Sequence, residues 1–367
     1  MGEPMTPLRV GIVGCGNISA QYLDTFSRLD TVELVAVADL VPERAAAVAA
    51  GVPGARALGI DELLADPQVQ LVVNLTIPAA HADVSLRALA AGKEVYTEKP
   101  LTADSASAAQ VMDAAAAAGL WVGCAPDTVL GTGIQTARKA VDDGLIGRPI
   151  SATATMITSG HERWHPNPDF YYLPGGGPLL DMGPYYVSAL IQLLGPVASV
   201  TGVASRLRDE RVIGSGPRAG ERIPVEVDTH VTGVLTHASG ALSTLVMSFD
   251  AVATRASNIE VHGESGSLVV PDPNNFDGEV LLNILGGDGW TALPVSAGYP
   301  HAGRGIGIHD RALVGPTEAR ASGALGQHAL DVMLSVLRSA DEGGTLHLTT
   351  TCERPSAVPL SPAEEYA

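Results

Sequence analysis

The sequence is poor in aromatic residues, cysteine and basic residues. Aromatic residues make up 4% of the 367 residues, so we expect an interior built mostly from alanine, valine, leucine and isoleucine. The three cysteines, at 15, 124 and 352, lie far apart and show no Cys-x-x-Cys spacing. This argues against a disulfide framework or a thiolate metal site, and we predict no bound metal. Lysine and arginine total 22 against 40 acidic residues, a net charge of −18. That balance argues against binding to nucleic acid or to anionic membranes.

Long hydrophobic runs are also missing from the sequence. No stretch of about 18 apolar residues occurs, so no membrane-spanning helix is expected. The N-terminus, MGEPMTPLRV, has no basic region followed by a long apolar segment, so we expect no signal peptide. These absences predict a soluble, cytoplasmic protein.

Apolar residues make up 46% of the chain and charged residues 17%, which is enough to bury a sizeable core. At about 100–200 residues per domain, the length favours two domains. The first third alternates apolar strand patterns, at 8–13, 32–38, 71–75, 94–97 and 120–124, with helical patterns. This alternation predicts an α/β Rossmann domain, a doubly wound parallel sheet, over residues 1–125.

The texture of the sequence changes near Pro126. Strand patterns follow at 150–158, 197–207, 225–236, 241–248, 258–263 and 280–285, several of them alternating between apolar and polar residues. Two helices are expected, at about 182–194 and 323–340, and the Gly-rich segment 286–310 is expected to be a long loop. Residues 126–367 therefore predict an α+β domain with a large, open, mainly antiparallel sheet.

The first strand runs into a glycine-rich turn, VGIVGCGNI, which contains Gly11, Gly14 and Gly16. Glycine at a strand-to-helix turn lets a pyrophosphate approach the backbone N–H groups of the helix N-terminus. The second strand ends at Asp39, 23 residues beyond Gly16, where a carboxylate can accept hydrogen bonds from a ribose diol. The Asp39 carboxylate would repel a 2′-phosphate, so NAD is favoured as the cofactor. NADP remains an alternative because of the nearby Arg44. Within this turn we predict that the cofactor also contacts Cys15, Asn17 and Ile18.

Two further strand ends carry polar side chains. Thr76, Pro78 and His81 follow the strand at 71–75, and Glu98 and Lys99 follow the strand at 94–97. Open α/β sheets bind ligands at the carboxyl ends of their strands, so all five are predicted to contact the cofactor. Since Pro100 keeps Lys99 extended, the lysine ammonium is expected to point to where the nicotinamide lies. For His81, an ordinary histidine at a helix start is the alternative.

These motifs, together with GGGPLLDMGPYY at 175–186, resemble the Gfo/Idh/MocA oxidoreductase family, which includes glucose–fructose oxidoreductase and inositol dehydrogenase. The resemblance covers about half of the chain, with the motifs in the family's order. It implies a Rossmann domain followed by an α/β domain with a large open sheet. It also implies a nicotinamide cofactor, a small-molecule sugar or polyol as substrate, and a homodimer or homotetramer.

The resemblance also implies catalytic residues. Lys99 resembles the family lysine that binds the substrate hydroxyl and manages its proton. The family pattern Asp-x-Gly-x-His has its counterpart at Asp181, Gly183 and Tyr185, with Tyr185 in place of the histidine. Asp181 and Tyr185 are four residues apart, so one turn of helix brings them to one face. We predict that these two residues and Lys99 act in catalysis and bind substrate. A helix cap for Asp181 and a packed core aromatic for Tyr185 are the alternatives.

The segment HERWH at 161–165 matches the zinc protease pattern His-Glu-x-x-His. A zinc site needs both histidines on one face of a helix, and Pro166 disfavours a helical His165. We therefore predict a loop on the substrate side, in which Trp164 offers an apolar face and His165 and Asn167 offer hydrogen bonds. A loop with incidental polar residues is the alternative.

Taken together, the sequence predicts an NAD(P)-dependent enzyme that transfers hydride between nicotinamide and a secondary alcohol of a sugar, cyclitol or related polyol. Lys99 would handle the hydroxyl proton. Tyr185 and Ser188 stand where the family pattern has histidine and a second aspartate. These two changes support one rival hypothesis, a nucleotide-binding sensor of the same fold that has lost turnover.

Overall fold

The computed structural model describes residues 6–361, which form two compact units. The first unit holds residues 6–131, 299–330 and 358–361. The second unit holds Thr132–Gly298 and Asp331–Ala357.

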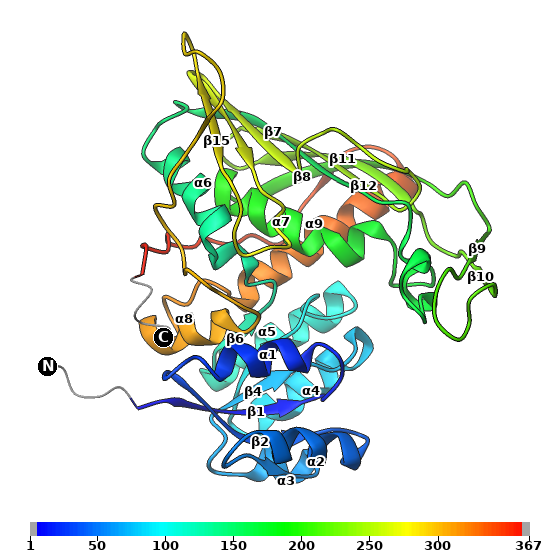
Figure 1. The fold of residues 1–367 in the computed structure, drawn as a ribbon, viewed down its shortest axis with the longest axis vertical. Coiled ribbons are helices and arrows are strands. Elements are labelled where there is room, and N and C mark those ends of the chain that lie inside the picture. The colour runs from blue at the N-terminus through cyan, green and yellow to red at the C-terminus, as the bar shows by residue number, and fades with distance from the viewer. Residues whose placement is uncertain (1–5, 362–367) are drawn as a thin grey trace, which may run out of the picture. The chain divides into compact units, whose positions relative to one another are not determined.

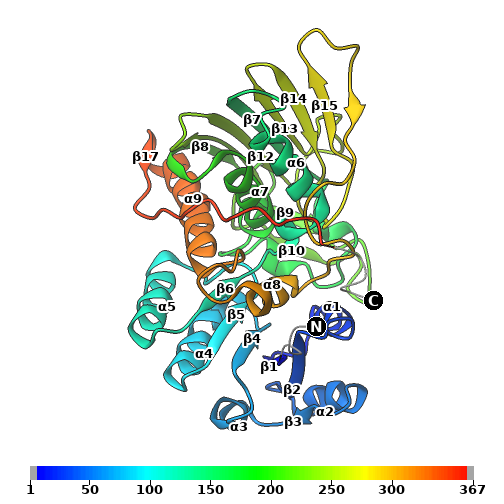
Figure 2. The same ribbon diagram turned by 90° about the vertical axis from the view of Figure 1, so that its left-hand side faces the viewer.

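The first unit is built on a six-stranded sheet in which every pair of neighbouring strands is parallel. The strand order is β3-β2-β1-β4-β5-β6, so β1 lies at the centre of the sheet and the order reverses beside it (Figures 1 and 2). This is the doubly wound arrangement, and it confirms the predicted Rossmann sheet. Its strands are β1 (Leu8–Val13), β2 (Val32–Ala38), β3 (Arg56–Ala57), β4 (Leu71–Asn74), β5 (Glu94–Thr97) and β6 (Val122–Cys124).

Helices connect these strands, and their ends follow local capping chemistry. Pro78 starts α4, because proline has the backbone φ of a first helical turn. Asp104 caps α5 by accepting the Ser107 N–H, and Gly119 ends it with a left-handed φ of 65°. The helices of this unit are α1 (Ser19–Phe26), α2 (Pro42–Gly51), α3 (Ile60–Ala65), α4 (Pro78–Ala90), α5 (Ser105–Ala118) and α8 (Ile306–Val314), with the 3₁₀ turn η1 (Thr128–Leu130).

The second unit contains a nine-stranded sheet in the order β16-β15-β14-β13-β7-β12-β11-β8-β17. Only the β12–β7 pair is parallel, which confirms the predicted, mainly antiparallel sheet. Its strands are β7 (Pro149–Ile157), β8 (Val197–Ser205), β11 (His230–His237), β12 (Leu242–Ser248), β13 (Ile259–Gly263), β14 (Gly266–Val270), β15 (Leu281–Ile284), β16 (Thr291–Ala292) and β17 (Leu346–His347). A separate hairpin pairs β9 (Glu210–Val212) with β10 (Arg222–Pro224).

Helices α6 (Thr132–Asp142) and α7 (Pro178–Leu194) lie against one face of this sheet (Figure 2). The alternation along β7 explains why, since Ala152, Ala154 and Met156 are buried while Thr153 is exposed and Thr155 is half-buried. The last helix, α9 (Gly323–Glu342), starts in the first unit and ends in the second. Short 3₁₀ turns form at η2 (His161–Arg163) and η3 (Asp169–Tyr171).

Helices α6 and α8 and strand β14 have no counterpart among the elements predicted from the sequence, and the prediction of a loop over 286–310 is wrong. That segment contains β16 and the start of α8 at Ile306. Glycine content suggested a loop throughout, but Gly305, with a φ of 96°, ends the loop directly before the helix. No helix within residues 6–361 combines the length and the apolar character needed to cross a membrane.

Candidate functional site

In the glycine turn after β1, Gly14 and Gly16 are glycine for different physical reasons. Gly14 has a φ of +102°, and a Cβ there would lie 2.7 Å from the backbone of Leu75, so this glycine serves the close approach of two neighbouring strand ends. A Cβ at Gly16 would meet no atom within 4 Å. Gly16 therefore faces open space before α1, and the reason for glycine there is not packing within the protein.

Asp39, at the end of β2, binds the glycine turn directly. Its Oδ2 accepts the Cys15 N–H at 2.7 Å, and its Oδ1 accepts the Val41 N–H at 2.8 Å. A carboxylate has about four acceptor positions, so two are left for hydroxyl groups of a ligand. Burial, followed by the charge of Asp39, raises the pKa of the Cys15 thiol to about 11, so the cysteine in the turn is a thiol at neutral pH.

An open pocket of about 680 Å³ lies at the glycine turn and is lined by Cys15, Gly16, Asn17, Ala20 and Arg44. It adjoins the N-terminus of α1, whose first N–H groups favour an anion such as a pyrophosphate. The missing Cβ at Gly16 leaves that space open. The residues of this turn therefore fit a dinucleotide.

At the end of β4, a buried asparagine organises the next turn. Asn74 donates to the His81 carbonyl at 3.0 Å and accepts the Thr76 hydroxyl at 2.6 Å. The His81 ring lies between two carbonyl oxygens, with Nδ1 2.7 Å from Pro100 O and Nε2 3.1 Å from Thr76 O. Burial lowers the pKa of His81 despite these carbonyls. The ring thus links the turn after β4 to the turn after β5, and Pro78 begins α4 beside it.

The turn after β5 is held by Glu98, which is buried. Its Oε1 accepts the Tyr22 hydroxyl at 2.8 Å, and its Oε2 accepts the backbone N–H of Lys99 at 3.0 Å. Burial and the Glu98 charge raise the pKa of Tyr22 well above its ordinary value, so the tyrosine stays a donor. The backbone of Lys99 is therefore fixed from α1, and its side chain is half-buried.

The structure brings the predicted cofactor residues, apart from Gly11, to one edge of the parallel sheet. Gly11 lies within β1, where a Cβ would come within 3.1 Å of Leu63 and Val69. The carboxyl ends of β1, β2, β4 and β5 are neighbours, and each is followed by one predicted group. These groups are Gly14–Ile18 after β1, Asp39 after β2, Thr76, Pro78 and His81 after β4, and Glu98 and Lys99 after β5.

In the second unit, Asp181 and Tyr185 lie on α7. Asp181 belongs to the first turn of the helix, because α7 starts at Pro178 rather than near Gly183. Negative charge is stabilising there. Tyr185 lies one turn later and is buried. His161, which was not predicted as a site residue, contacts Asp181. Its Nε2 lies 3.0 Å from Asp181 Oδ2.

The HERWH segment forms the 3₁₀ turn η2 rather than an α-helix. Its histidines therefore have different surroundings. His161 is buried, whereas His165 is half-buried and accepts the Asn167 N–H at Nδ1. Trp164 is 59% exposed. Within residues 6–361 no group of three or more histidine, cysteine or acidic side chains could hold a metal ion.

His161 and Tyr22 were not predicted as site residues. The sequence signal at His161 is its match to a zinc protease pattern, which predicts a metal ligand and not a partner for Asp181. Tyr22 carries no sequence signal, since its partner Glu98 is 76 residues away.

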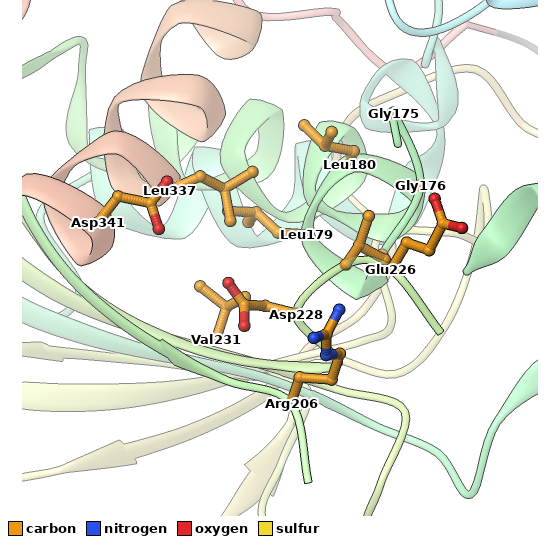
Figure 3. Close-up of a pocket in the computed structure, with 12 residues that line it drawn as sticks. Gly175, Gly176, Leu179, Leu180, Arg206, Glu226, Asp228, Val231, Leu337 and Asp341 are labelled. Carbon is orange, nitrogen blue, oxygen red and sulfur yellow. The ribbon is translucent and has the colours of Figure 1, made fainter. Parts of the chain in front are cut away.

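A further pocket in the second unit, of about 300 Å³, lies between α7, α9 and the sheet (Figure 3). Figure 3 shows leucine side chains from both helices beside charged groups, Arg206, Glu226, Asp228 and Asp341. None of the predicted substrate residues lines this pocket, so we assign it no part in the site described above.

Comparison with known proteins identifies the family. Residues 8–125 match the oxidoreductase family with an NAD-binding Rossmann fold, and residues 134–269 match the GFO/IDH/MocA C-terminal domain. An inositol 2-dehydrogenase of Rhizobium meliloti is 31% identical over 292 residues, which cover 78% of this chain and 82% of the relative. The chain belongs to the GFO/IDH/MocA family of oxidoreductases.

Other similar proteins match most of the chain. A 1,5-anhydro-D-fructose reductase of Ensifer adhaerens is 26% identical, covering 93% of this chain and 99% of the relative. Among solved structures, an NAD-binding oxidoreductase of Klebsiella pneumoniae superimposes with a TM-score of 0.80 at 25% identity, covering 94% of this chain and 99% of the other. The family assignment confirms the resemblance seen in the motifs and makes the first unit an NAD(P)-binding Rossmann domain.

Proposed function

We propose that the protein transfers hydride between nicotinamide and a secondary alcohol of a sugar, cyclitol or related polyol. The substrate class is supported by two relatives in this family, an inositol 2-dehydrogenase and a 1,5-anhydro-D-fructose reductase. The observation that carries the proposal is the common sheet edge at which the glycine turn, Asp39 and Lys99 all follow neighbouring parallel strands.

Lys99 is the residue that we propose handles the hydroxyl proton. Its backbone is held by Glu98, which is itself bonded to Tyr22, so the lysine starts from a fixed position. An ammonium group donates to the substrate oxygen, and a neutral amine takes its proton when the alcohol is oxidised to a ketone. When bound, the nicotinamide supplies the acceptor or donor of the hydride.

The cofactor is proposed to be NAD. Asp39 keeps acceptor positions for a ribose diol and would repel a 2′-phosphate. Arg44 lines the same pocket and is exposed, so NADP is the second candidate for this site.

The second unit is proposed to contribute Asp181 and Tyr185 to catalysis, and Trp164, His165 and Asn167 to substrate binding. Asp181 is partly exposed and sits in the first turn of α7. Trp164 presents an exposed indole face next to the polar groups of His165 and Asn167. An apolar face beside hydrogen-bonding groups suits a polyol, which has both C–H and O–H surfaces.

The proposal is tested by measuring NAD⁺ reduction with a panel of cyclitols, anhydrosugars and aldoses, and NADH oxidation with the matching ketones. Lys99→Ala is expected to bind NADH and to lower kcat by about 10²- to 10⁴-fold. Lys139→Ala is the matched control. It removes the charge of a lysine on α6 that forms an exposed ion pair with Asp143, and it is expected to change kcat by less than about twofold.

Two results would contradict the proposal. Wild-type protein that binds NADH but turns over no member of the panel would favour the sensor hypothesis. Full activity in Lys99→Ala would remove the lysine from the mechanism while leaving the cofactor site in place.

We also propose that the protein assembles as a homodimer or homotetramer. On the face of the large sheet opposite α6 and α7, Val203, Val234 and Leu242 are 65%, 43% and 48% exposed on three adjacent strands. An apolar open sheet face favours association. Sedimentation velocity at micromolar concentration tests this, and a monomer would contradict it.

A further inference from the structure

The contact between His161 and Asp181 has no counterpart in the sequence pattern that predicted the site. The two residues are 20 positions apart and come from different elements, the 3₁₀ turn η2 and the first turn of α7. We propose that His161 is a positioning residue, which orients the Asp181 carboxylate for the reaction by donating a hydrogen bond from Nε2. The inference rests on the proposed role of Asp181 in turnover.

The direction of the hydrogen bond follows from its two partners. An ionised carboxylate only accepts hydrogen bonds, so the proton lies on His161 Nε2, 3.0 Å from Asp181 Oδ2. The other ring nitrogen, Nδ1, is buried and has no hydrogen-bond partner among the described residues. A buried nitrogen without an acceptor favours the form that carries no proton there. The surroundings therefore favour the tautomer whose proton lies on Nε2.

The imidazole is held rigidly by aromatic rings. Its centroid lies 4.4 Å from that of Phe249 and 4.6 Å from that of Tyr171, and Trp164 lies 5.2 Å away. Close rings on several sides leave the imidazole little freedom to rotate. A ring fixed in this way can hold a carboxylate in one orientation.

The backbone of η2 is fixed as well, by a buried polar network. The His161 N–H donates to the Tyr172 hydroxyl, which in turn donates to Glu162. Arg211 pairs with both Glu162 and Asp250, and the Arg211 and Glu162 side chains are almost completely buried. The network therefore fixes the position from which His161 reaches α7.

The exposure of the two side chains separates their roles. Asp181 is the more accessible member, with its side chain 18% exposed against 11% for His161, and Nδ1 of the histidine is shielded from solvent. A ligand can thus reach the carboxylate but not the free nitrogen of the imidazole. His161 therefore acts through Asp181 and does not itself touch the substrate.

Glutamine and asparagine at position 161 form a discriminating pair of variants. The amide nitrogen of glutamine can take the position of Nε2, whereas that of asparagine reaches only the position of Nδ1. With a polyol that wild-type protein oxidises, His161→Asn and His161→Phe are expected to lower kcat about tenfold to a hundredfold, with KM changed less than about twofold. His161→Gln is expected to restore kcat to within about threefold of wild type.

His262→Phe provides the matched control in the same unit. His262 lies on β13, opposite Ser151 of β7, and its Nε2 lies 3.9 Å from the carboxylate of Glu260. His262→Phe also removes an imidazole that lies beside a carboxylate, and it is expected to leave kcat within about twofold of wild type. Equal kcat in His161→Gln and His161→Asn, or a change confined to KM, would overturn the proposal.

A second readout needs no substrate. In ¹⁵N-labelled protein, the side-chain ¹⁵N–¹H correlations of His161 should show the Nε2–H tautomer, and Asp181→Ala should alter them. An Nδ1–H pattern, or a spectrum unchanged by Asp181→Ala, would overturn the proposal even if the enzyme is active. A lack of turnover with every polyol, together with the expected Nε2–H pattern, would instead contradict the proposed function.

Discussion

Replacing Tyr22 by phenylalanine removes the single hydroxyl that binds Glu98, the residue that holds the backbone of the proposed catalytic Lys99. The hydroxyl donates to Glu98 Oε1 at 2.8 Å, and both side chains are buried. The ring itself keeps its contacts with Phe26 and Tyr96, so the change opens no large cavity. Loss of a buried hydrogen bond to a charged group costs about 1.5–3 kcal/mol, so we expect the free energy of unfolding to fall by about 2 kcal/mol.

Urea unfolding and calorimetry measure this loss. For a unit of this size, about 2 kcal/mol corresponds to a fall in Tm of about 4–8 °C. Because Glu98 also holds the Lys99 N–H, a carboxylate that shifts after losing Tyr22 should displace the lysine. We therefore expect kcat to fall by about tenfold, with a smaller effect on NADH binding.

Tyr299→Phe is the control for this experiment. Its hydroxyl donates to Asp310 Oδ1 at 2.7 Å, a buried tyrosine–carboxylate pair in the same unit. Asp310 also pairs with Arg320, so the expected loss of stability is smaller, about 1 kcal/mol, and kcat should not change. A Tyr22→Phe variant that loses less than about 0.5 kcal/mol and keeps full kcat would refute the reasoning.

Two further predictions concern the first unit. Gly16→Val should leave the Tm of the protein without cofactor unchanged, since a Cβ at Gly16 meets no other atom, but it should weaken NADH binding at least about tenfold. Gly51→Val is the control, because Gly51 on α2 is equally open, and it should not weaken NADH binding. Equal affinities of the two variants for NADH in isothermal titration calorimetry would contradict the cofactor site. Burial lowers the pKa of His309 from 6.5 to about 4, so below pH 6.5 the unfolded chain binds a proton that the folded chain does not. Stability should therefore fall as pH drops from about 6.5 to 4, by about 3 kcal/mol in all, and urea titrations of His309→Gln should show a flatter pH dependence.

The first sheet could be predicted in detail because its signals are local. The apolar runs around Val10, Val35 and Val73 are long enough to be buried on both faces, which is typical of parallel strands covered by helices. The signal for the glycine turn is also local, because the left-handed φ of Gly14 favours glycine at that one position. Helix α6 was missed although Ile134, Ala137 and Val141 recur at helical spacing along it. Its polar residues Gln135 and Arg138 are buried as well, and only the tertiary structure decides that burial.

The candidate site was predictable only in part. Residues next to strand ends, such as Asp39, Thr76 and Lys99, could be chosen because a parallel sheet brings its carboxyl ends to one edge. The sequence could not show that Asp39 already holds the Cys15 N–H, or that both nitrogens of His81 face backbone carbonyls. Such partners depend on distances between side chains, and no spacing in the sequence encodes them.

The sequence alone determined the family, the parallel first sheet and the strand-rich second unit, because hydrophobic periodicity and glycine turns act over a few residues. The tertiary structure decided which distant groups meet. It alone joined Tyr22 to Glu98 across 76 residues and His161 to Asp181 across 20. The physical reason is that a hydrogen bond between distant segments forms only after the core has packed and fixed both backbones, so its partners are set by the fold as a whole.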